Sequence, residues 1–412
     1  MKSRDYWPVN WVDGMKIHKG HFQAQGAYTN EQLALLAEAA LTDFSFGLLP
    51  PREGHPTLEL VVTSERVELR NCRAITRGGY LLTVGPENSE ELQRRMSDLM
   101  YGRDFSEADT WLVVLRVHPD ETCPLGTPDP EETPLRQPYS MTRLSLEVLP
   151  AQQVISVDGF RHALPLARII RSYQGIERDR DFIPPVTLTL ASDQLMQRQQ
   201  YWKELLLDME GNTFEIIRKI KDKHRNNLGN QLSADLLSLT ENCIRYINEH
   251  FDTYRLLLPR RAPVELFLWF MALARTIKNE LRLAGNQENM LNYMAHFIDG
   301  VGPTDLMRRC NDLCDLQYDH LALREMVVRV DDFLDFITRL FSQVRELDYH
   351  QIATPTIIDN RAYSRPERDL QSPVIRPAAK PGGKSLRITS RGAESNTRPD
   401  SPGSGDGGWG LE

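Results

Sequence analysis

The chain has 412 residues, enough for two or three domains at the usual size of roughly 100 to 200 residues each. Its composition, with 41% hydrophobic and 26% charged residues, is that of an ordinary globular protein. The formal net charge of -8 argues against a general nucleic-acid binder, because phosphate contacts need an excess of Lys and Arg. We therefore expect no nucleic-acid partner.

The N-terminus, "MKSRDYWPVNWVDG", has no apolar segment between a basic stretch and a small-residue cleavage site. A secretory signal peptide is therefore not expected, and the predicted location is the cytoplasm. The most apolar run, from Leu266 to Ala274, is far shorter than the roughly 20 residues of a spanning helix. It predicts a buried helix and no direct membrane insertion.

The stretch "WVDGMKIHKGHFQAQ", from Trp11 to Gln25, has little helical period. We interpret it as a strand with turns at Gly14 and Gly20. A helix is predicted after it, with Asn30 as N-cap before "EQLALLAEAAL".

Short alternating runs dominate the chain from there to about Pro185 and predict half-buried strands. "TLELVVTSERVELRNCRAITRGGYLLTV" breaks at Gly78-Gly79, and "TWLVVLRVHP" and "MTRLSLEVLPAQQVISV" continue the pattern. The segment from Asp120 to Pro138 is rich in proline and acids, so we predict a surface loop there.

The period changes at Ser192, a predicted helix cap. A two-column seam at heptad spacing, apolar except for one Thr, then predicts a helix of about 30 residues: Leu195, Trp202, Met209 and Ile216, with Leu206, Thr213 and Ile220. A second helix should run from about Ser233 to Leu258, before Pro259, and a third from Pro263 to near Gly285. Two shorter helices should be bounded by Gly300 and by Gly302-Pro303.

The last predicted helix has a stripe with spacings of four and three. Such a narrow stripe suits either an internal helix of a bundle or a contact between subunits, and we name it the trimer or bundle seam. Its members are Leu323, Val327, Val330, Leu334, Ile337, Phe341 and Val344.

The final residues are rich in Pro, Gly, Ser and Arg, which cannot bury enough apolar surface to offset chain entropy, and predict disorder. The expected fold class is therefore α+β. It comprises a β-rich sandwich domain over residues 1–191, an α-helical bundle over residues 192–350 and a disordered tail over residues 351–412.

No strong catalytic motif is present. The sequence holds no phosphate-binding glycine loop, no "GxSxG" and no "HExxH". On a strand, His18 and His21 would point to opposite faces and could not hold one metal ion. Asp331, Asp332 and Asp335 are interpreted as a solvated helix face. We predict a non-enzymatic protein with no cofactor and no metal.

The five cysteines lack the spacing of a disulfide framework, and we expect them to be reduced. Cys310 and Cys314 would share a helical face, but no second Cys or His pair has the spacing of a zinc site. Both are predicted to be core residues.

Several stretches resemble TssK, the trimeric baseplate subunit family of bacterial type VI secretion systems. "VNWVDGMKIHKGHFQAQ" is similar to its N-terminal signature. "LTDFSFGLL", "VELRNCRAITRGGYLLTV" and "LPLARIIRSYQGIERDRDFIPPVTLTLASDQL" follow in the same order, and the resemblance covers about Trp7 to Glu280. Departures are Lys19-Gly20 in place of Pro-Gln, Phe46 in place of Trp, and a tail in place of a folded membrane-facing domain after Arg345.

The resemblance implies a β-rich shoulder that binds baseplate wedge subunits of the TssF and TssG type, a homotrimer, and a location at the inner face of the cytoplasmic membrane. Contact with a membrane-complex protein would be indirect. The implied wedge-docking residues, whose aromatics either fill the core or form the interface, are Trp11, Asp13, Gly14, Met15, His21, Phe22 and Gln23.

Two other functions compete with the baseplate reading. One is a receptor-binding module of a phage-type tail that recognises a surface glycan. The other is a hydrolase that uses His18 or His21, which loss of both histidines would disable.

Overall fold

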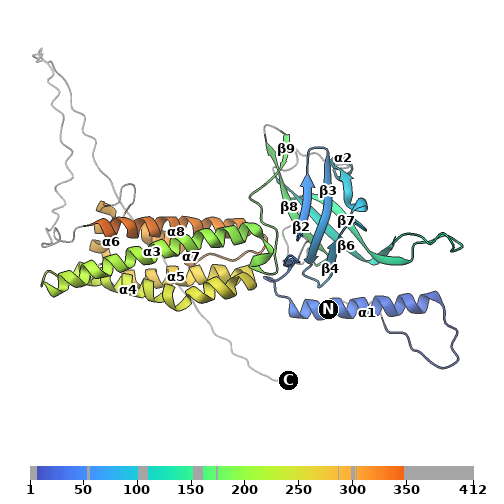
Figure 1. Cartoon of the computed structure of the whole chain (residues 1–412), viewed down its shortest axis with the longest axis horizontal. Helices are drawn as coiled ribbons and strands as arrows, with labels where there is room; N and C mark the ends of the chain where they lie inside the picture. Colours follow the sequence, from blue (N-terminus) through green and yellow to red (C-terminus); the bar gives the residue numbers. More distant parts are fainter. Residues whose placement is uncertain are drawn as a thin grey trace, which may run out of the picture. The chain divides into compact units, whose positions relative to one another are not determined.

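A computed structural model describes residues 7–52, 56–100, 110–151, 161–172, 175–285, 287–297, 302 and 304–347 (Figure 1). Strands precede the long helices in chain order, so the fold class is α+β. The β-rich part and the helices belong to one compact unit. The predicted division into domains at residues 191 and 350 stays a prediction, and the predicted tail lies outside the described residues.

Two antiparallel sheets form the β-rich part. In the five-stranded sheet, β3 is the central strand and pairs with the other four. Gly79, at φ +81°, makes the β3–β4 turn that Gly78-Gly79 predicted. The strands are β1 (Gly47–Leu48), β2 (Leu58–Val62), β3 (Arg66–Ile75), β4 (Leu81–Val84) and β5 (Gln93–Arg95).

The second sheet has the order β7-β6-β8-β9. Its long hairpin corrects the predicted loop, because Asp120 to Leu125 belong to β6 and only residues 126–138 connect the strands. Pro119 and Pro124 are tolerated because β8 pairs with β6 only as far as Arg116, which leaves one side of the strand without a ladder. The strands are β6 (Thr110–Leu125), β7 (Tyr139–Pro150), β8 (Ala163–Ser172) and β9 (Gly175–Arg178).

Helix α1 (Lys19–Ala40) overturns the reading of the N-terminal stretch as a strand. His18 is its N-cap, so Gly20 lies in the first helical turn and Asn30 lies inside the helix. Residues 7–18 form no strand, although the turn at Gly14 is present, with φ +78°. A short helix, α2 (Met96–Leu99), follows β5.

The helical part begins at Ser192, whose Oγ accepts a hydrogen bond from the Leu195 amide at 3.3 Å. This confirms the predicted cap, and all seven column residues of α3 are fully buried. Pro263 begins α5 as predicted. The helices are α3 (Asp193–Arg225), α4 (Gln231–Asp252), α5 (Pro263–Leu283), α6 (Gln287–Phe297), α7 (Asp305–Cys314) and α8 (Leu323–Glu346).

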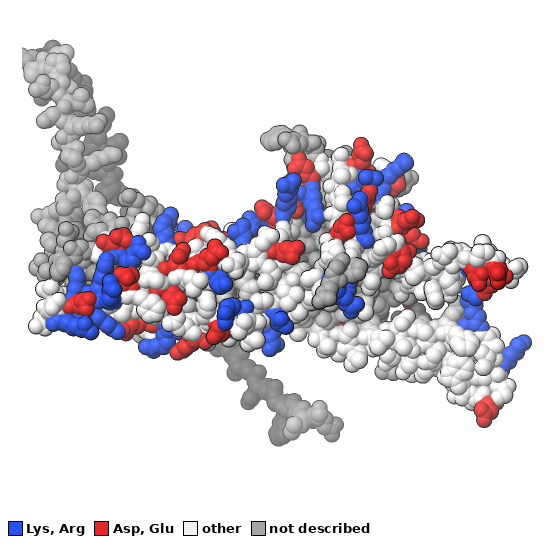
Figure 2. All heavy atoms as spheres, viewed as in Figure 1, with Lys and Arg blue, Asp and Glu red and all other residues white. Residues whose placement is uncertain are grey.

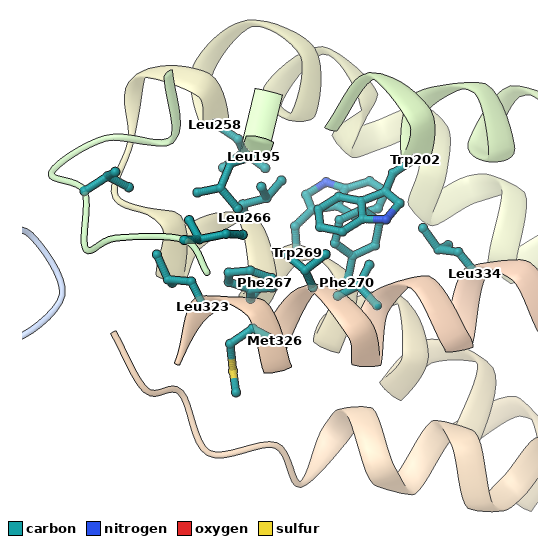
Figure 3. Packing of buried hydrophobic residues seen from close by; sticks show 14 of the residues in the cluster. Leu195, Trp202, Leu258, Leu266, Phe267, Trp269, Phe270, Leu323, Met326 and Leu334 are labelled. Atoms are coloured by element: carbon teal, nitrogen blue, oxygen red, sulfur yellow. The ribbon is translucent and has the colours of Figure 1, made fainter. Parts of the chain in front are cut away.

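Large apolar side chains from α3, α5 and α8 fill the centre of the helical part (Figure 3). The Trp202 ring lies edge-on to Phe270 at 5.0 Å between centroids. Leu266, Phe267 and Ala274 are buried on α5, as expected of a core helix. Among the described residues, no helix is long and apolar enough to cross a bilayer.

The seven seam residues of α8 are only 0 to 1% exposed within a single chain. They pack inside the bundle, where α8 lies against α3. A contact between subunits through this stripe would require the bundle to open. The subunit-contact interpretation of the seam is therefore wrong, and the internal interpretation accounts for it.

Candidate functional site: the N-terminal arm and helix α1

Residues 7–18, which we name the N-terminal arm, expose large apolar side chains. Trp7 is 68% and Trp11 46% exposed, and Phe22 on α1 is 64% exposed. Val12 and Ile17 are also exposed. The aromatics of this stretch were expected either to fill the core or to form an interface. Their exposure does not fit a core position for Trp11 and Phe22.

The arm runs back along α1. The Val9 amide donates to Oε1 of Gln25 at 3.2 Å, and the turn at Gly14 is closed by a 3.3 Å hydrogen bond from the Met15 amide to the Val12 carbonyl. Only a residue that adopts positive φ easily suits this turn. The arm therefore has a defined course although it forms no strand.

An aromatic cluster joins the arm to the first turn of α1. The Trp11 ring lies 5.9 Å from the ring of His21 and 6.0 Å from that of Phe22, between centroids. The rings of His18 and His21 lie 3.8 Å apart between centroids and are tilted by 32°, which corrects the expectation that they point to opposite faces. That expectation assumed a strand, whereas residues at this spacing are neighbours on a helix.

The other predicted docking residues lie in the same region. Asp13 and Gly14 form the exposed turn, Gln23 is exposed, and Met15 is partly buried. Sequence reasoning missed Trp7, Val12 and Ile17. The sequence feature that could have identified them is that apolar residues are frequent in this stretch but follow neither a helical nor a strand period.

Two observations on the described residues concern metal binding and thiol chemistry. No group of three or more His, Cys, Asp or Glu side chains among those residues could hold a metal ion. Burial raises the pKa of the Cys72 and Cys310 thiols to about 12, the opposite of what a reactive thiolate needs. Cys314, predicted to be in the core, is only partly buried, and all five cysteines are free.

Two stretches that carry the family resemblance meet beside the bundle. Leu48, from "LTDFSFGLL", forms a bridge with Val186, from "FIPPVTLTLASDQL", and its carbonyl accepts from the Thr187 hydroxyl at 3.0 Å. An added Cβ at Gly47 would lie 2.1 Å from the Pro185 carbonyl oxygen. This close approach explains why glycine stands there.

The loop before α8 closes this junction from the helical side. Nε2 of His320 lies 2.8 Å from the Phe46 carbonyl oxygen, and Nδ1 lies 2.7 Å from the Tyr318 hydroxyl. The carbonyl can only accept, so Nε2 carries the proton and the hydroxyl donates to Nδ1. Burial lowers the pKa of His320 to about 4.

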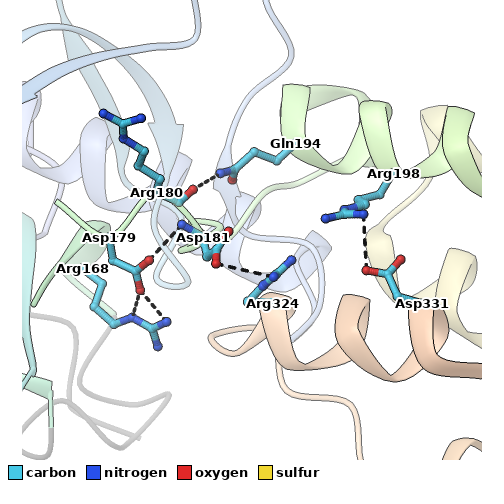
Figure 4. Close-up of polar contacts among 8 residues, drawn as sticks. All are labelled: Arg168, Asp179, Arg180, Asp181, Gln194, Arg198, Arg324 and Asp331. Carbon is cyan, nitrogen blue, oxygen red and sulfur yellow. Dashed lines mark hydrogen bonds and ion pairs between the residues drawn. The ribbon is translucent and has the colours of Figure 1, made fainter.

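Ion pairs continue the junction at the surface (Figure 4). Arg168 donates to Asp179 at 2.6 Å, and Arg324 of α8 lies 3.5 Å from Asp181. Asp331, predicted to be solvated, instead accepts from the Trp202 indole at 2.7 Å and is mostly buried. It connects α8 to α3.

No family model matches the chain, and no curated protein matches it. Four solved structures similar to it are all TssK or type VI secretion baseplate structures. A crystal structure of TssK gives a TM-score of 0.43 at 14% identity and covers 82% of this chain and 69% of that chain. A TssK-TssF-TssG baseplate subcomplex gives 0.45 at 16% identity, covering 81% and 99%. TssK of the T6SS from EAEC, bound to nanobody nb18, gives 0.42 at 18% identity, covering 78% and 99%.

Proposed function

We propose that this chain is a non-enzymatic adaptor of a type VI secretion baseplate, which docks on wedge subunits of the TssF and TssG type. It acts as a homotrimer in the cytoplasm, at the inner face of the cytoplasmic membrane, and any link to the membrane complex is indirect. The observation that carries this proposal is the exposure of Trp11, in the stretch with the family signature.

The physical argument concerns what an exposed tryptophan costs. Leaving large aromatic side chains in water forfeits the roughly 1.5 to 3 kcal/mol that burying one apolar side chain contributes. The arm holds several apolar side chains together, supported by the contact between Trp11 and His21. A cluster of aromatic anchors with a defined course is what a protein interface uses as its centre.

Copurification with candidate wedge subunits tests this proposal. Trp11→Ala should weaken binding about thirtyfold, because a hot-spot aromatic contributes about 2 kcal/mol. The thermal unfolding midpoint should stay unchanged, since Trp11 is about half exposed. The control is Tyr139→Ala, which removes another exposed aromatic ring, on β7.

Three results would count against the proposal. Wild-type protein that binds no wedge subunit contradicts it directly. If Trp11→Ala lowers solubility and the unfolding midpoint instead, the residue belongs to the core. Binding of a surface glycan by the wild-type protein would favour the receptor-binding alternative. The hydrolase alternative would instead require that the wild-type protein hydrolyse a substrate and that His18→Ala with His21→Ala abolish that hydrolysis.

A further inference from the structure

The connection between α4 and α5 contains a π-helical turn. The turn covers Thr253–Leu257, and a 3-10 turn over Leu258–Arg260 follows it. Pro259 lacks an amide N–H, so a regular helix cannot continue through it. Turns of the π type are rare in proteins and occur frequently at functional sites. This segment is therefore a candidate binding surface.

Two buried side chains fix the π-helical turn on the bundle. The hydroxyl of the fully buried Tyr254 donates to the Gln199 carbonyl of α3 at 2.7 Å, and Nε2 of Gln199 donates to the Tyr254 carbonyl at 2.9 Å. Leu258 is also buried. Between these anchors, Leu256 is 55% and Leu257 51% exposed. A fixed segment of backbone therefore presents two leucines to solvent, which lowers the entropy cost of binding a partner.

Three arginines flank the exposed leucines. Arg255 pairs with Asp252 at 3.0 Å, in an exposed ion pair. Among the residues that the structure describes, no ion pair involves the guanidinium groups of Arg260 and Arg261. The backbone there is fixed, because the Arg261 carbonyl accepts from the Thr189 amide at 2.9 Å. We name this surface the π-turn patch, and its members are Arg255, Leu256, Leu257, Arg260 and Arg261.

The π-turn patch combines an apolar centre with positive charge at its edge. Figure 2 shows Lys and Arg side chains at the end of the helical part that adjoins the β-rich part. A guanidinium group binds a carboxylate through two parallel N–H donors, and arginine is enriched at protein interfaces. Exposed leucines favour an apolar contact. The complementary surface is therefore one that carries both carboxylates and apolar side chains.

We propose that an acidic amphipathic segment of a partner protein docks on the π-turn patch. Its apolar side chains pack on Leu256 and Leu257, and its Asp or Glu side chains pair with Arg260 and Arg261. This surface lies on the bundle, is separate from the N-terminal arm, and goes beyond the proposed wedge docking.

An anionic membrane offers similar chemistry but fits the π-turn patch less well. A bilayer presents an even charge, so its attraction follows the net charge of the surrounding protein surface. Residues 249–261 hold three Arg against two acids, a net charge of +1. One such charge contributes only about fivefold to lipid affinity. A folded partner, in contrast, can place one carboxylate against each free guanidinium group and avoid Glu249 and Asp252.

Selection from a random peptide library tests the proposal on the full chain. Phage that bind the variant Leu256→Ser with Leu257→Ser are removed first, and the remaining phage are selected on the wild-type protein. The enriched peptides should be rich in Asp and Glu beside apolar residues. Peptides without acidic enrichment contradict the proposed chemistry. A selection that yields no peptide dependent on the two leucines contradicts the site.

The arginines provide a measurement that is independent of the selection. Arg260→Gln with Arg261→Gln should weaken binding of the best synthetic peptide about tenfold, read by fluorescence anisotropy, because each exposed ion pair contributes modestly. Added salt should weaken binding to the wild-type protein more than binding to this variant. The thermal unfolding midpoint should not change, since both side chains are exposed. Equal affinities of the two proteins would overturn the proposal.

A matched control removes exposed leucines that have no arginine beside them. Leu33 is 60% and Leu36 71% exposed on α1. Leu33→Ser with Leu36→Ser should leave the peptide affinity unchanged. If this pair weakens binding as much as Leu256→Ser with Leu257→Ser does, the peptide binds any exposed apolar surface and the inference is wrong.

Vesicle sedimentation separates a protein partner from lipid. Vesicles of equal parts phosphatidylglycerol and phosphatidylcholine should sediment the wild-type protein and the variant Arg260→Gln with Arg261→Gln to the same extent. Greater sedimentation of the wild-type protein would assign the π-turn patch to anionic lipid and overturn the proposal.

Discussion

Glycine is required at one position of this fold and is unfavourable at another. Gly47 has φ +118°, and an added Cβ would collide with the Pro185 backbone. Gly211 lies within α3, and a Cβ there would meet nothing within 4 Å. The first position therefore needs glycine, whereas the second only loses helix stability by having it.

Gly47→Ala should lower the free energy of unfolding by at least about 2 kcal/mol, because strained backbone and steric overlap add together. Gly211→Ala should raise it by about 0.5 to 1 kcal/mol. Urea unfolding followed by circular dichroism measures both values. Equal effects of the two substitutions would contradict the close approach at Gly47.

At the scale of the elements, two carboxylates of α8 make the contact with α3 in different surroundings. Asp331 accepts from the buried Trp202 indole at 2.7 Å, and Asp335 accepts from the Tyr201 hydroxyl at the surface, also at 2.7 Å. Burial raises the pKa of Asp331, an effect that the indole hydrogen bond opposes. The cost of removing each carboxylate should follow its burial.

Asp331→Ala should destabilise the protein by about 1 to 3 kcal/mol, because it leaves a buried indole N–H without an acceptor. Asp335→Ala removes the same group from the same helix and should change stability by less than about 0.5 kcal/mol. The measurement is the midpoint of urea unfolding at pH 7. A larger loss for Asp335→Ala would show that the solvated pair, and not the buried one, holds the helices together.

The elements differ in how far the sequence predicts them. Helices α3 and α8 follow from apolar spacing, because long stripes leave no other way to bury Trp202 or Leu334. The sequence does not predict the start of α1, because Gly20 and Gly26 suggest turns and the N-cap, His18, is not one of the usual cap residues Ser, Thr, Asp or Asn. The exposed state of Trp11 was undecidable from sequence, since an aromatic anchor and a core aromatic look alike.

On the scale of the whole molecule, His320 joins the β-rich part to the helices. Its ring packs against Phe46 at 4.8 Å between centroids while both nitrogens are hydrogen-bonded. No sequence pattern indicated this contact, because its partners are 274 residues apart. A lone histidine in a loop carries no period, and its burial depends on the complete fold.

The neutral state of His320 gives the stability a pH dependence. Its pKa is about 4 in the folded protein against 6.5 for the ordinary side chain, because burial disfavours the charged ring. Between these values the unfolded chain binds a proton that the folded protein does not. The stabilising contribution is therefore complete above pH 6.5 and is lost as the pH falls towards 4. At about 1.4 kcal/mol per pH unit, it amounts to roughly 3 kcal/mol.

His320→Gln should remove this dependence, because the amide can still donate to the Phe46 carbonyl but does not titrate. The free energy of unfolding is measured in urea at intervals from pH 7 to pH 4. It should fall less steeply with pH in the variant than in the wild-type protein, and the two slopes should differ by about 1.4 kcal/mol per pH unit, the value for one proton. Carboxylates titrate over the same range in both proteins, so only the difference between the two curves reports His320. If the free energy of unfolding falls equally steeply with pH in both proteins, His320 is protonated or reached by water in the folded protein. The junction would then lack the neutral hydrogen-bonded ring that joins its two sides.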